Sequence, residues 1–253
     1  YISKKEVKYL KSIQAFPTNI KRHKDHYIPQ TYMYQWDLNN DDKIKIVRRR
    51  SGYEEILETS PCSICYEKGG DFLDFSTCKI NLPGFIRSNF ETTYRKNIES
   101  LERSYDITDP ILKDVRSLCC SLFFFNPERQ KRGNVKNISK EDINNFLIKY
   151  SSVIFDYMDE SDITFHFYSE PKLLTSSDPI VDLSVLDDTG SATNFHILVP
   201  LSPSLLVEFL WEEKYHGRGF NESQVTGDVD KHYDLIKASN DCMMSRMETI
   251  FYD

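Results

Sequence analysis

The hydrophobic pattern changes period once along the chain, and this change limits the folds that the chain can adopt. From about residue 83 to residue 157, apolar side chains recur every three or four residues, the spacing of helices with one buried face. From about residue 162 they alternate with polar side chains, as in strands with one buried face. A run of helices followed by a run of strands indicates an α+β fold. We expect a mixed, mainly antiparallel sheet packed by three or four long helices, in a single domain spanning residues 1–253.

The same patterns predict the individual elements. Helices are expected at residues 3–13, 29–36, 83–105, 109–123, 139–157 and 228–251, the last with a break near Asn240. Strands are expected at residues 43–47, 52–57, 163–168, 173–174, 196–201 and 205–211. The irregular segment between residues 58 and 82 indicates a loop with a small helix.

A dense block of polar and aromatic side chains, His26–Trp36, follows a basic leader. Pro29 suits the first turn of a short helix, because its φ is fixed and it lacks a backbone donor. In such a helix His26 and Gln30 lie on the same side of the entry turn and could present an imidazole and an amide together. The apolar face of the helix consists of Ile28, Tyr32 and Trp36. The alternative is that His26 caps the helix, Gln30 bonds a neighbouring backbone group and the aromatic residues belong to the core.

A second polar cluster, Thr175–Pro179, ends the strand that begins at Leu173. Strand ends often carry functional side chains, so Ser176, Ser177 and Asp178 are candidates for a site. The alternative is a structural turn, because an aspartate before a proline initiates turns by itself.

Charge divides the chain into a basic N-terminal lobe, residues 1–50, and an acidic body. The lobe holds twelve Lys or Arg and five Asp or Glu, a net charge of +7, whereas the whole chain carries −7, so the other 203 residues carry −14. A second basic segment spans Arg129–Asn134 and contains Lys131 and Arg132. These cations could draw phosphate-bearing ligands towards His26. Alternatively, they pair with acidic residues across an interface inside the molecule.

Four segments resemble those of a bacterial family known only as domain of unknown function 4238. They are His26–Met33, Phe125–Arg129, Thr175–Pro179 and Pro200–Pro203. The likeness spans roughly residues 23 to 251 and implies a shared fold and a bacterial or phage setting, without an established activity. Three positions depart from the family pattern: Asp25 replaces the first histidine of a pair, Phe125 replaces an arginine, and Asp178 stands one place later than the family's acid.

The cysteines indicate a reducing, cytoplasmic setting. Cys119 and Cys120 lie in an apolar helical pattern, where thiols act as small hydrophobic side chains. Cys62 and Cys65, with Cys78 thirteen residues later, form half of a zinc-ribbon pattern. A complete site needs a further close pair of ligands, so no metal site is predicted.

Other functional classes lack their sequence signatures. The chain contains no Gly-rich phosphate loop, no HExxH motif and no Gly-x-Ser-x-Gly elbow. The longest apolar stretch, Leu118–Phe125, is interrupted by Ser121 and is far shorter than the roughly 20 residues of a membrane span. Nucleotide-dependent oxidoreductases, NTPases and a membrane partner are therefore not expected, while the cofactor and the oligomeric state stay open.

Two hypotheses from different classes follow. The first is an enzyme acting on phosphodiesters, a nuclease-like effector of a bacterial defence or toxin system. In it His26 is the general acid or base, Gln30 orients it and Asp178 holds a metal or water. The phosphate and substrate contacts come from Arg129, Lys131, Arg132, Ser176 and Ser177. The second is a non-catalytic partner-binding protein, such as an antitoxin, an immunity protein or a phage-encoded inhibitor, whose acidic body covers a basic surface. The enzyme hypothesis requires His26, Gln30 and Asp178 to share one cleft.

Overall fold

The structure is a computed structural model that describes most of the chain. The described residues are 24–50, 52–68, 73–75, 78–80, 90–124, 126, 161–186, 192–212, 223–226, 233–246 and 248–251. The predicted helices at residues 3–13 and 139–157 and the basic residues Arg129, Lys131 and Arg132 lie outside these ranges.

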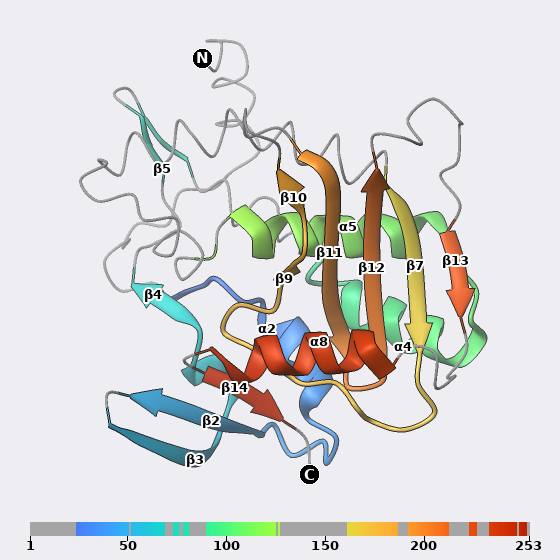
Figure 1. The fold of residues 1–253 in the computed structure, drawn as a ribbon. Helices are drawn as coiled ribbons and strands as arrows, with labels where there is room; N and C mark the ends of the chain where they lie inside the picture. Colours follow the sequence, from blue (N-terminus) through green and yellow to red (C-terminus); the bar gives the residue numbers. More distant parts are fainter. Residues whose placement is uncertain are drawn as a thin grey trace.

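The larger of the two main sheets has the strand order β10-β11-β12-β7-β13, and β9 also pairs with β11 (Figure 1). Its strands are β7 (Asp162–Phe167), β9 (Val181–Asp182), β10 (Val185–Leu186), β11 (Ala192–Ser202), β12 (Leu205–Glu212) and β13 (Ser223–Thr226). The β13–β7 pair is parallel, and the other pairs are antiparallel. The predicted α+β fold with a mixed, mainly antiparallel sheet is therefore confirmed.

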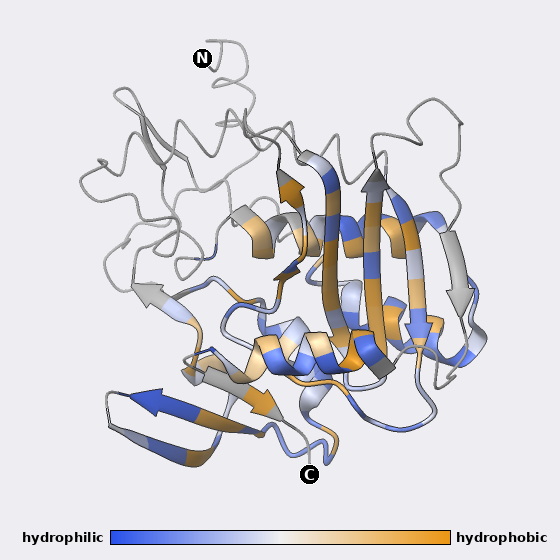
Figure 2. Ribbon diagram, in the orientation of Figure 1, coloured by the Kyte–Doolittle hydropathy of each residue, from blue (hydrophilic) through white to orange (hydrophobic). Residues whose placement is uncertain are grey.

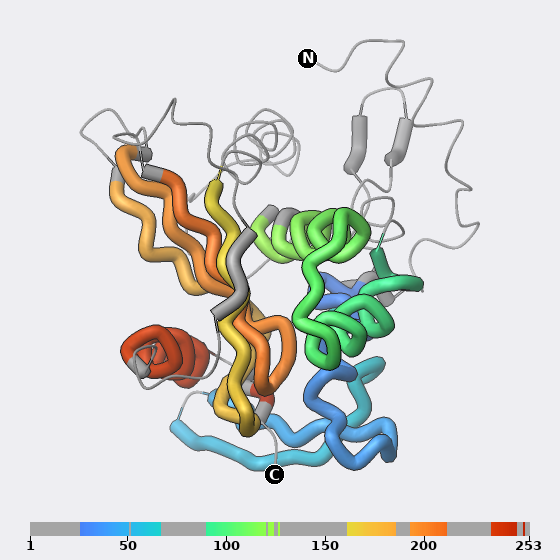
Figure 3. The backbone as a smooth tube through the Cα atoms, turned by 90° about the vertical axis from the view of Figure 1, so that its right-hand side faces the viewer, coloured from blue at the N-terminus to red at the C-terminus, as the bar shows by residue number. Residues whose placement is uncertain are grey.

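Helices cover both faces of this sheet. Figure 3 shows α4 (Tyr94–Ser104) and α5 (Asp109–Phe124) on one side and α8 (Tyr233–Met244) on the other. The residues of β11 and β12 explain this, because apolar side chains stand at odd-numbered and at even-numbered positions and so lie on both faces of the sheet (Figure 2). Odd-numbered residues such as Phe165 and Val207 pack in the main core with α4 and α5. Even-numbered Leu198 and Leu206 pack in a smaller cluster with Met243 of α8.

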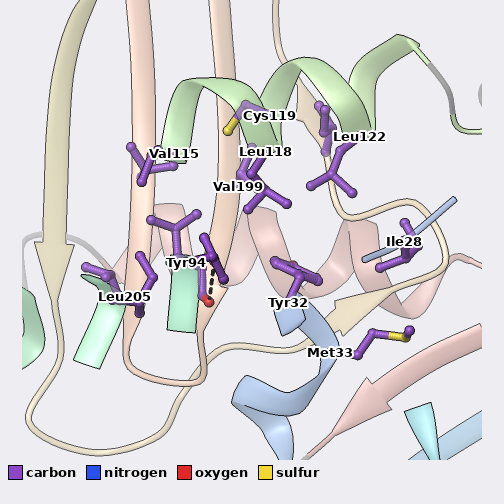
Figure 4. Packing of buried hydrophobic residues seen from close by; sticks show 14 of the residues in the cluster. Ile28, Tyr32, Met33, Tyr94, Val115, Leu118, Cys119, Leu122, Val199 and Leu205 are labelled. Atoms are coloured by element: carbon purple, nitrogen blue, oxygen red, sulfur yellow. Dashed lines mark hydrogen bonds between the residues drawn. The ribbon is translucent and has the colours of Figure 1, made fainter. Parts of the chain in front are cut away.

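The predicted motif helix lies in the middle of the main core. It forms as α2 (Gln30–Met33), continued by the 3-10 helix η2 (Tyr34–Trp36). The expected apolar face is buried, since Ile28, Tyr32 and Trp36 each expose 2% or less of their surface. Figure 4 shows Tyr32 and Ile28 beside α5 side chains such as Leu118. Pro29 is the N-cap residue and no side chain bonds to the helix start, so His26 does not cap the helix.

A second sheet has the order β3-β2-β14-β8 and contains the predicted hairpin. Its strands are β2 (Ile44–Arg50), β3 (Tyr53–Thr59), β8 (Thr175–Ser176) and β14 (Glu248–Phe251). The small elements are the paired strands β1 (Lys24–His26) and β4 (Tyr66–Lys68), the pair β5 (Leu73–Phe75) and β6 (Cys78–Ile80), and the 3-10 helix η3 (Pro61–Ser63). The β3-β2-β14-β8 sheet joins β2 of the N-terminal lobe to β14 near the end of the chain.

The C-terminal helix differs from the prediction of one helix over residues 228–251 that breaks near Asn240. Helix α8 runs through Asn240 and ends at Met244, and β14 then pairs with β2 and β8. Asn240 does not break the helix because its side chain bonds to another segment. Its Oδ1 accepts the Leu174 backbone N–H at 2.9 Å, and its Nδ2 donates to the Lys172 carbonyl at 2.7 Å.

Among the described residues, no helix combines the length and the apolar composition needed to cross a membrane.

Candidate functional site

His26 and Gln30 lie together, as the spacing in the motif suggested. The Gln30 side-chain amide nitrogen is 3.2 Å from each ring nitrogen of His26. The Nε2 of His26 is 3.3 Å from the Cys62 carbonyl, and its ring lies against Tyr66 with centroids 5.7 Å apart. Because a carbonyl can only accept, Nε2 donates to Cys62 and Nδ1 is left to accept from Gln30. Both ring nitrogens of this half-buried histidine are therefore engaged within the chain.

Tyr32 joins the motif helix to two distant segments. Its hydroxyl donates to the Pro200 carbonyl at 2.7 Å and lies 2.6 Å from the Thr175 hydroxyl, which must therefore donate to it. Trp36 adds a bond from its ring N–H to the Leu173 carbonyl at 3.3 Å. Burial raises the pKa of Tyr32 well above its usual value, so the hydroxyl remains a donor. The motif helix thus fastens the start of β8 at Thr175 to the end of β11. The predicted strand at residues 173–174 is wrong, because the strand begins only at Thr175.

The polar strand end forms a fully buried turn. Ser176, Ser177 and Asp178 expose 0% of their surface. The Ser176 hydroxyl donates to the Asp178 carbonyl at 2.9 Å, and the side-chain amide of Asn126 donates to the Ser177 carbonyl at 2.8 Å. An Arg246 Nη2 lies 3.7 Å from the Asp178 carboxylate. A carboxylate in this position pairs with charge inside the molecule and does not line a cleft open to solvent.

The four segments that carry the family likeness thus meet at one place. Tyr32 contacts Thr175 and Pro200, and Asn126 contacts Ser177. The His26–Gln30 pair does not face this junction. Residues two apart on an α-helix project roughly 200° apart, so Gln30 points to a different side of α2 from Tyr32. The structure therefore brings the segments together without placing His26 and Asp178 in one open site.

The basic residues of the hairpin are partly neutralised by their own partner strand. Arg49 of β2 forms an ion pair with Glu54 of β3 at 2.8 Å, and Arg48 lies 3.6 Å from Glu55. On this hairpin the carboxylates of β3 therefore offset part of the net positive charge of the lobe. These ion pairs lie within one hairpin. Pairing of the lobe with the acidic body across an interface stays a prediction.

A cluster of two histidines and one glutamate lies on the α8 side of the larger sheet. His166 comes from β7, Glu208 from β12 and His196 from β11. His166 Nε2 lies 2.8 Å from Glu208 Oε2, and His196 Nε2 lies 2.7 Å from Glu208 Oε1. Since carboxylate oxygens accept, the Nε2 atom of each ring carries the proton. One carboxylate therefore fixes the orientation of two imidazoles.

The cluster is accessible at one end. The side chains of His196 and Glu208 are 20% and 16% exposed, while that of His166 is 3% exposed. No hydrogen-bond partner of His196 Nδ1 is found among the described residues. An imidazole that donates from Nε2 to a carboxylate has Nδ1 left as the nitrogen that can accept a proton.

The electrostatics of the cluster keep the glutamate ionised. Burial by itself raises the pKa of Glu208, but the hydrogen bonds from His166 and His196, together with their positive charge, outweigh it and lower the pKa to about 2. Glu208 is therefore a fixed negative charge throughout the neutral range.

This arrangement predicts a specific acid dependence of stability. The pKa of Glu208 in the folded protein, about 2, is below its ordinary value of 4.5, so the unfolded chain takes up the proton first as the pH falls. The contribution of Glu208 is complete above pH 4.5 and is lost between pH 4.5 and pH 2. We expect it to be on the order of 2 kcal/mol after allowance for solvent screening.

Urea unfolding of the wild type and of Glu208→Gln at a series of pH values measures this contribution. The free energies of unfolding should differ at pH 7 and converge as the pH falls towards 3. The variant Glu99→Gln, which removes an exposed carboxylate that pairs with Arg95 and Arg103, is the control and should stay close to the wild type throughout. A gap between Glu208→Gln and the wild type that persists unchanged at pH 3 would contradict the assigned pKa.

Sequence analysis missed this cluster, although each member gave a signal. His166 and His196 each belong to a predicted strand, 163–168 and 196–201, and Glu208 is the one charged residue in the apolar run Leu205–Trp211. The register between the strands brings them together. Glu208 lies opposite Thr164 of β7 and Leu198 of β11. His166 is two residues from Thr164 and His196 is two residues from Leu198, so all three side chains share one face of the sheet.

Within the described ranges, no group of three or more His, Cys, Asp or Glu side chains is arranged to hold a metal ion. Comparison of the chain with protein-family models, with curated proteins and with solved structures finds no match.

Proposed function

We propose that this chain is a hydrolase that cleaves phosphodiester bonds, a nuclease-like enzyme whose proton-transfer site is the His166–Glu208–His196 cluster. The observation that carries the proposal is the pair of bonds, 2.8 Å and 2.7 Å long, that hold two imidazoles on one ionised carboxylate. The cluster takes over the role that the sequence suggested for His26, whose two ring nitrogens are engaged with Cys62 and Gln30.

His196 is the catalytic residue in this proposal. Its Nδ1 takes a proton from a water molecule as the water oxygen attacks phosphorus. The resulting imidazolium is stabilised by Glu208 and returns the proton to the leaving oxygen as its bond to phosphorus breaks. One water is consumed and the histidine is regenerated, so the reaction balances.

Glu208 and His166 are positioning residues. Glu208 holds the ring of His196 with Nε2 protonated, which leaves Nδ1 as the nitrogen that can accept a proton. His166, almost completely buried, holds the second carboxylate oxygen.

The charge layout of the sequence supports a phosphate-bearing substrate. Arg129, Lys131 and Arg132 form a basic segment in an otherwise acidic body and are the proposed phosphate contacts. The proposed setting is the cytoplasm, because Cys119 and Cys120 lie in an apolar helical pattern, where thiols act as small hydrophobic side chains.

The test is cleavage of defined substrates by the full chain. Labelled single-stranded and double-stranded RNA and DNA are incubated with the protein, with and without added Mg²⁺ or Mn²⁺, and a p-nitrophenyl carboxylic ester serves as the comparison class. We expect cleavage of at least one nucleic acid that increases with protein concentration and is absent from Glu208→Gln prepared in parallel. Hydrolysis of the carboxylic ester alone would contradict the substrate class, and no turnover of any substrate would contradict the proposal as a whole.

A further inference from the structure

Strand β3 forms an outer edge of the molecule. Among the residues that the structure describes, β3 pairs with β2 alone, at the end of the strand order β3-β2-β14-β8. Figures 1 and 3 both show it at the margin of the fold, beyond β2. An edge strand presents backbone N–H and C=O groups to which another extended chain can bind.

The outward face of this edge has an apolar centre between two acids. Ile56 is 72% exposed, the most exposed large hydrophobic residue in the described part of the chain, and Val47 of β2 lies directly opposite it. Glu54 and Glu58 stand two residues to either side of Ile56 and share its face. An exposed isoleucine flanked by carboxylates forms a short alternating pattern that a complementary strand can match.

The charges on this face decide which partner fits. If a second copy of the chain paired antiparallel about Ile56, Glu54 of each copy would lie opposite Glu58 of the other. Like charges directly opposite one another destabilise a strand pair. A segment with an apolar residue opposite Ile56 and Lys or Arg two positions to either side would instead pair opposite charges. The ion pair of Glu54 with Arg49 does not prevent this, because Glu54 is 63% exposed and exposed pairs contribute little.

The edge is supported by the core and does not have to be ordered on binding. Ile44 and Ile46 of β2 are buried in the main core, and β14 pairs with β2 from Lys45 to Arg48. A preformed edge lowers the entropy cost of adding a strand.

We propose that β3 is a docking edge for an extended peptide segment in which a central apolar residue is flanked, two positions to either side, by lysine or arginine. The segment adds to the sheet as a further strand next to β3. This inference is independent of the hydrolase proposal, because the edge belongs to a different sheet from the His166–Glu208–His196 cluster.

Fluorescence anisotropy with labelled heptapeptides and the full chain tests the proposal. The probe is a threonine heptapeptide with valine at its centre and lysine two positions to either side. One comparison peptide has glutamate in place of lysine, and another is the probe with alternate backbone nitrogens methylated. We expect saturable binding of the probe, and binding weaker by about tenfold or more for each comparison peptide. Equal binding of the methylated probe would overturn strand addition and leave only charge attraction.

Variants of the protein locate the edge. Ile56→Lys should weaken binding of the probe by about tenfold or more, because it removes the apolar centre and adds a repelling charge. Leu38→Lys is the matched control, since Leu38 is also an exposed large apolar residue, 48% accessible, but lies outside β3. Equal loss in both variants, or no binding of the probe to the wild type, would overturn the proposal. The proposal would also be overturned if the wild type were a dimer that Ile56→Lys converts to a monomer, because the edge would then be a self-association surface.

Discussion

Replacement of His196 by alanine is expected to lower the rate of phosphodiester cleavage by about 100-fold to 10,000-fold, the range that general acid–base catalysis contributes. The physical reason is that His196 is the more exposed of the two histidines and that Glu208 orients its ring from 2.7 Å. The measurement is the single-turnover rate on the nucleic acid that the wild type cleaves, with the folded state of each variant checked by thermal unfolding.

His26→Ala is the comparison that separates the two candidate histidines. His26 contacts Cys62 and Gln30, and its variant should keep a rate within a few-fold of the wild type. His166→Gln should reduce the rate less than His196→Ala, because a side-chain amide can still donate a hydrogen bond to Glu208. If His26→Ala lost activity and His196→Ala retained it, the site would lie at the motif helix instead.

Replacement of Tyr32 by phenylalanine is expected to lower the free energy of unfolding by about 3 kcal/mol, the largest loss from removal of a single oxygen among the described residues. The change leaves two buried groups without their partner, the Thr175 hydroxyl and the Pro200 carbonyl. Each unsatisfied buried group costs roughly 1–3 kcal/mol. Urea unfolding measures the loss.

Two further tyrosines calibrate this value. Tyr94→Phe removes a single bond, from the buried Tyr94 hydroxyl to the Leu201 carbonyl at 3.0 Å, and should cost roughly half as much. Tyr34→Phe changes a half-buried residue of η2 and should be close to neutral. A loss in Tyr32→Phe no larger than that in Tyr34→Phe would show that the contact of Tyr32 with Thr175 and Pro200 does not stabilise the fold.

The parts of the fold that follow from local pattern could be predicted from sequence. Helix α5, the β2–β3 hairpin and the strands β7, β11 and β12 form where the apolar spacing placed them. The end of the chain could not be predicted in this way. Residues 248–251 continue the apolar residues of α8 in sequence, but they are extended because β2 and β8 offer backbone partners on both sides. The helical spacing of the apolar residues favours a continued helix, whereas pairing with distant strands favours an extended conformation, and only the folded molecule shows which one forms.

Of the candidate sites, too, one could be predicted from sequence and the other could not. The contact of His26 with Gln30 joins the end of β1 to the first residue of α2, and the sequence alone indicated that the two side chains lie on the same side of this entry turn. The meeting of His166 with Glu208 depends on the register between β7 and β12, and that of His196 with Glu208 on the hairpin between β11 and β12. The register of this hairpin shifts between Pro200 and Ser202, which a strand pattern does not reveal.

The most direct test of the proposed site is the response of the histidine rings to a bound substrate analogue. The protein is labelled with ¹⁵N in its histidines, and a phosphorothioate oligonucleotide that resists cleavage is added while the ring nitrogens are followed by NMR. We predict that His196 of the protein without oligonucleotide is protonated at Nε2. On binding, the resonance of its Nδ1 should shift, whereas the ring resonances of His26 should not. Shifts confined to His26, with His196 unchanged at saturation, would contradict it.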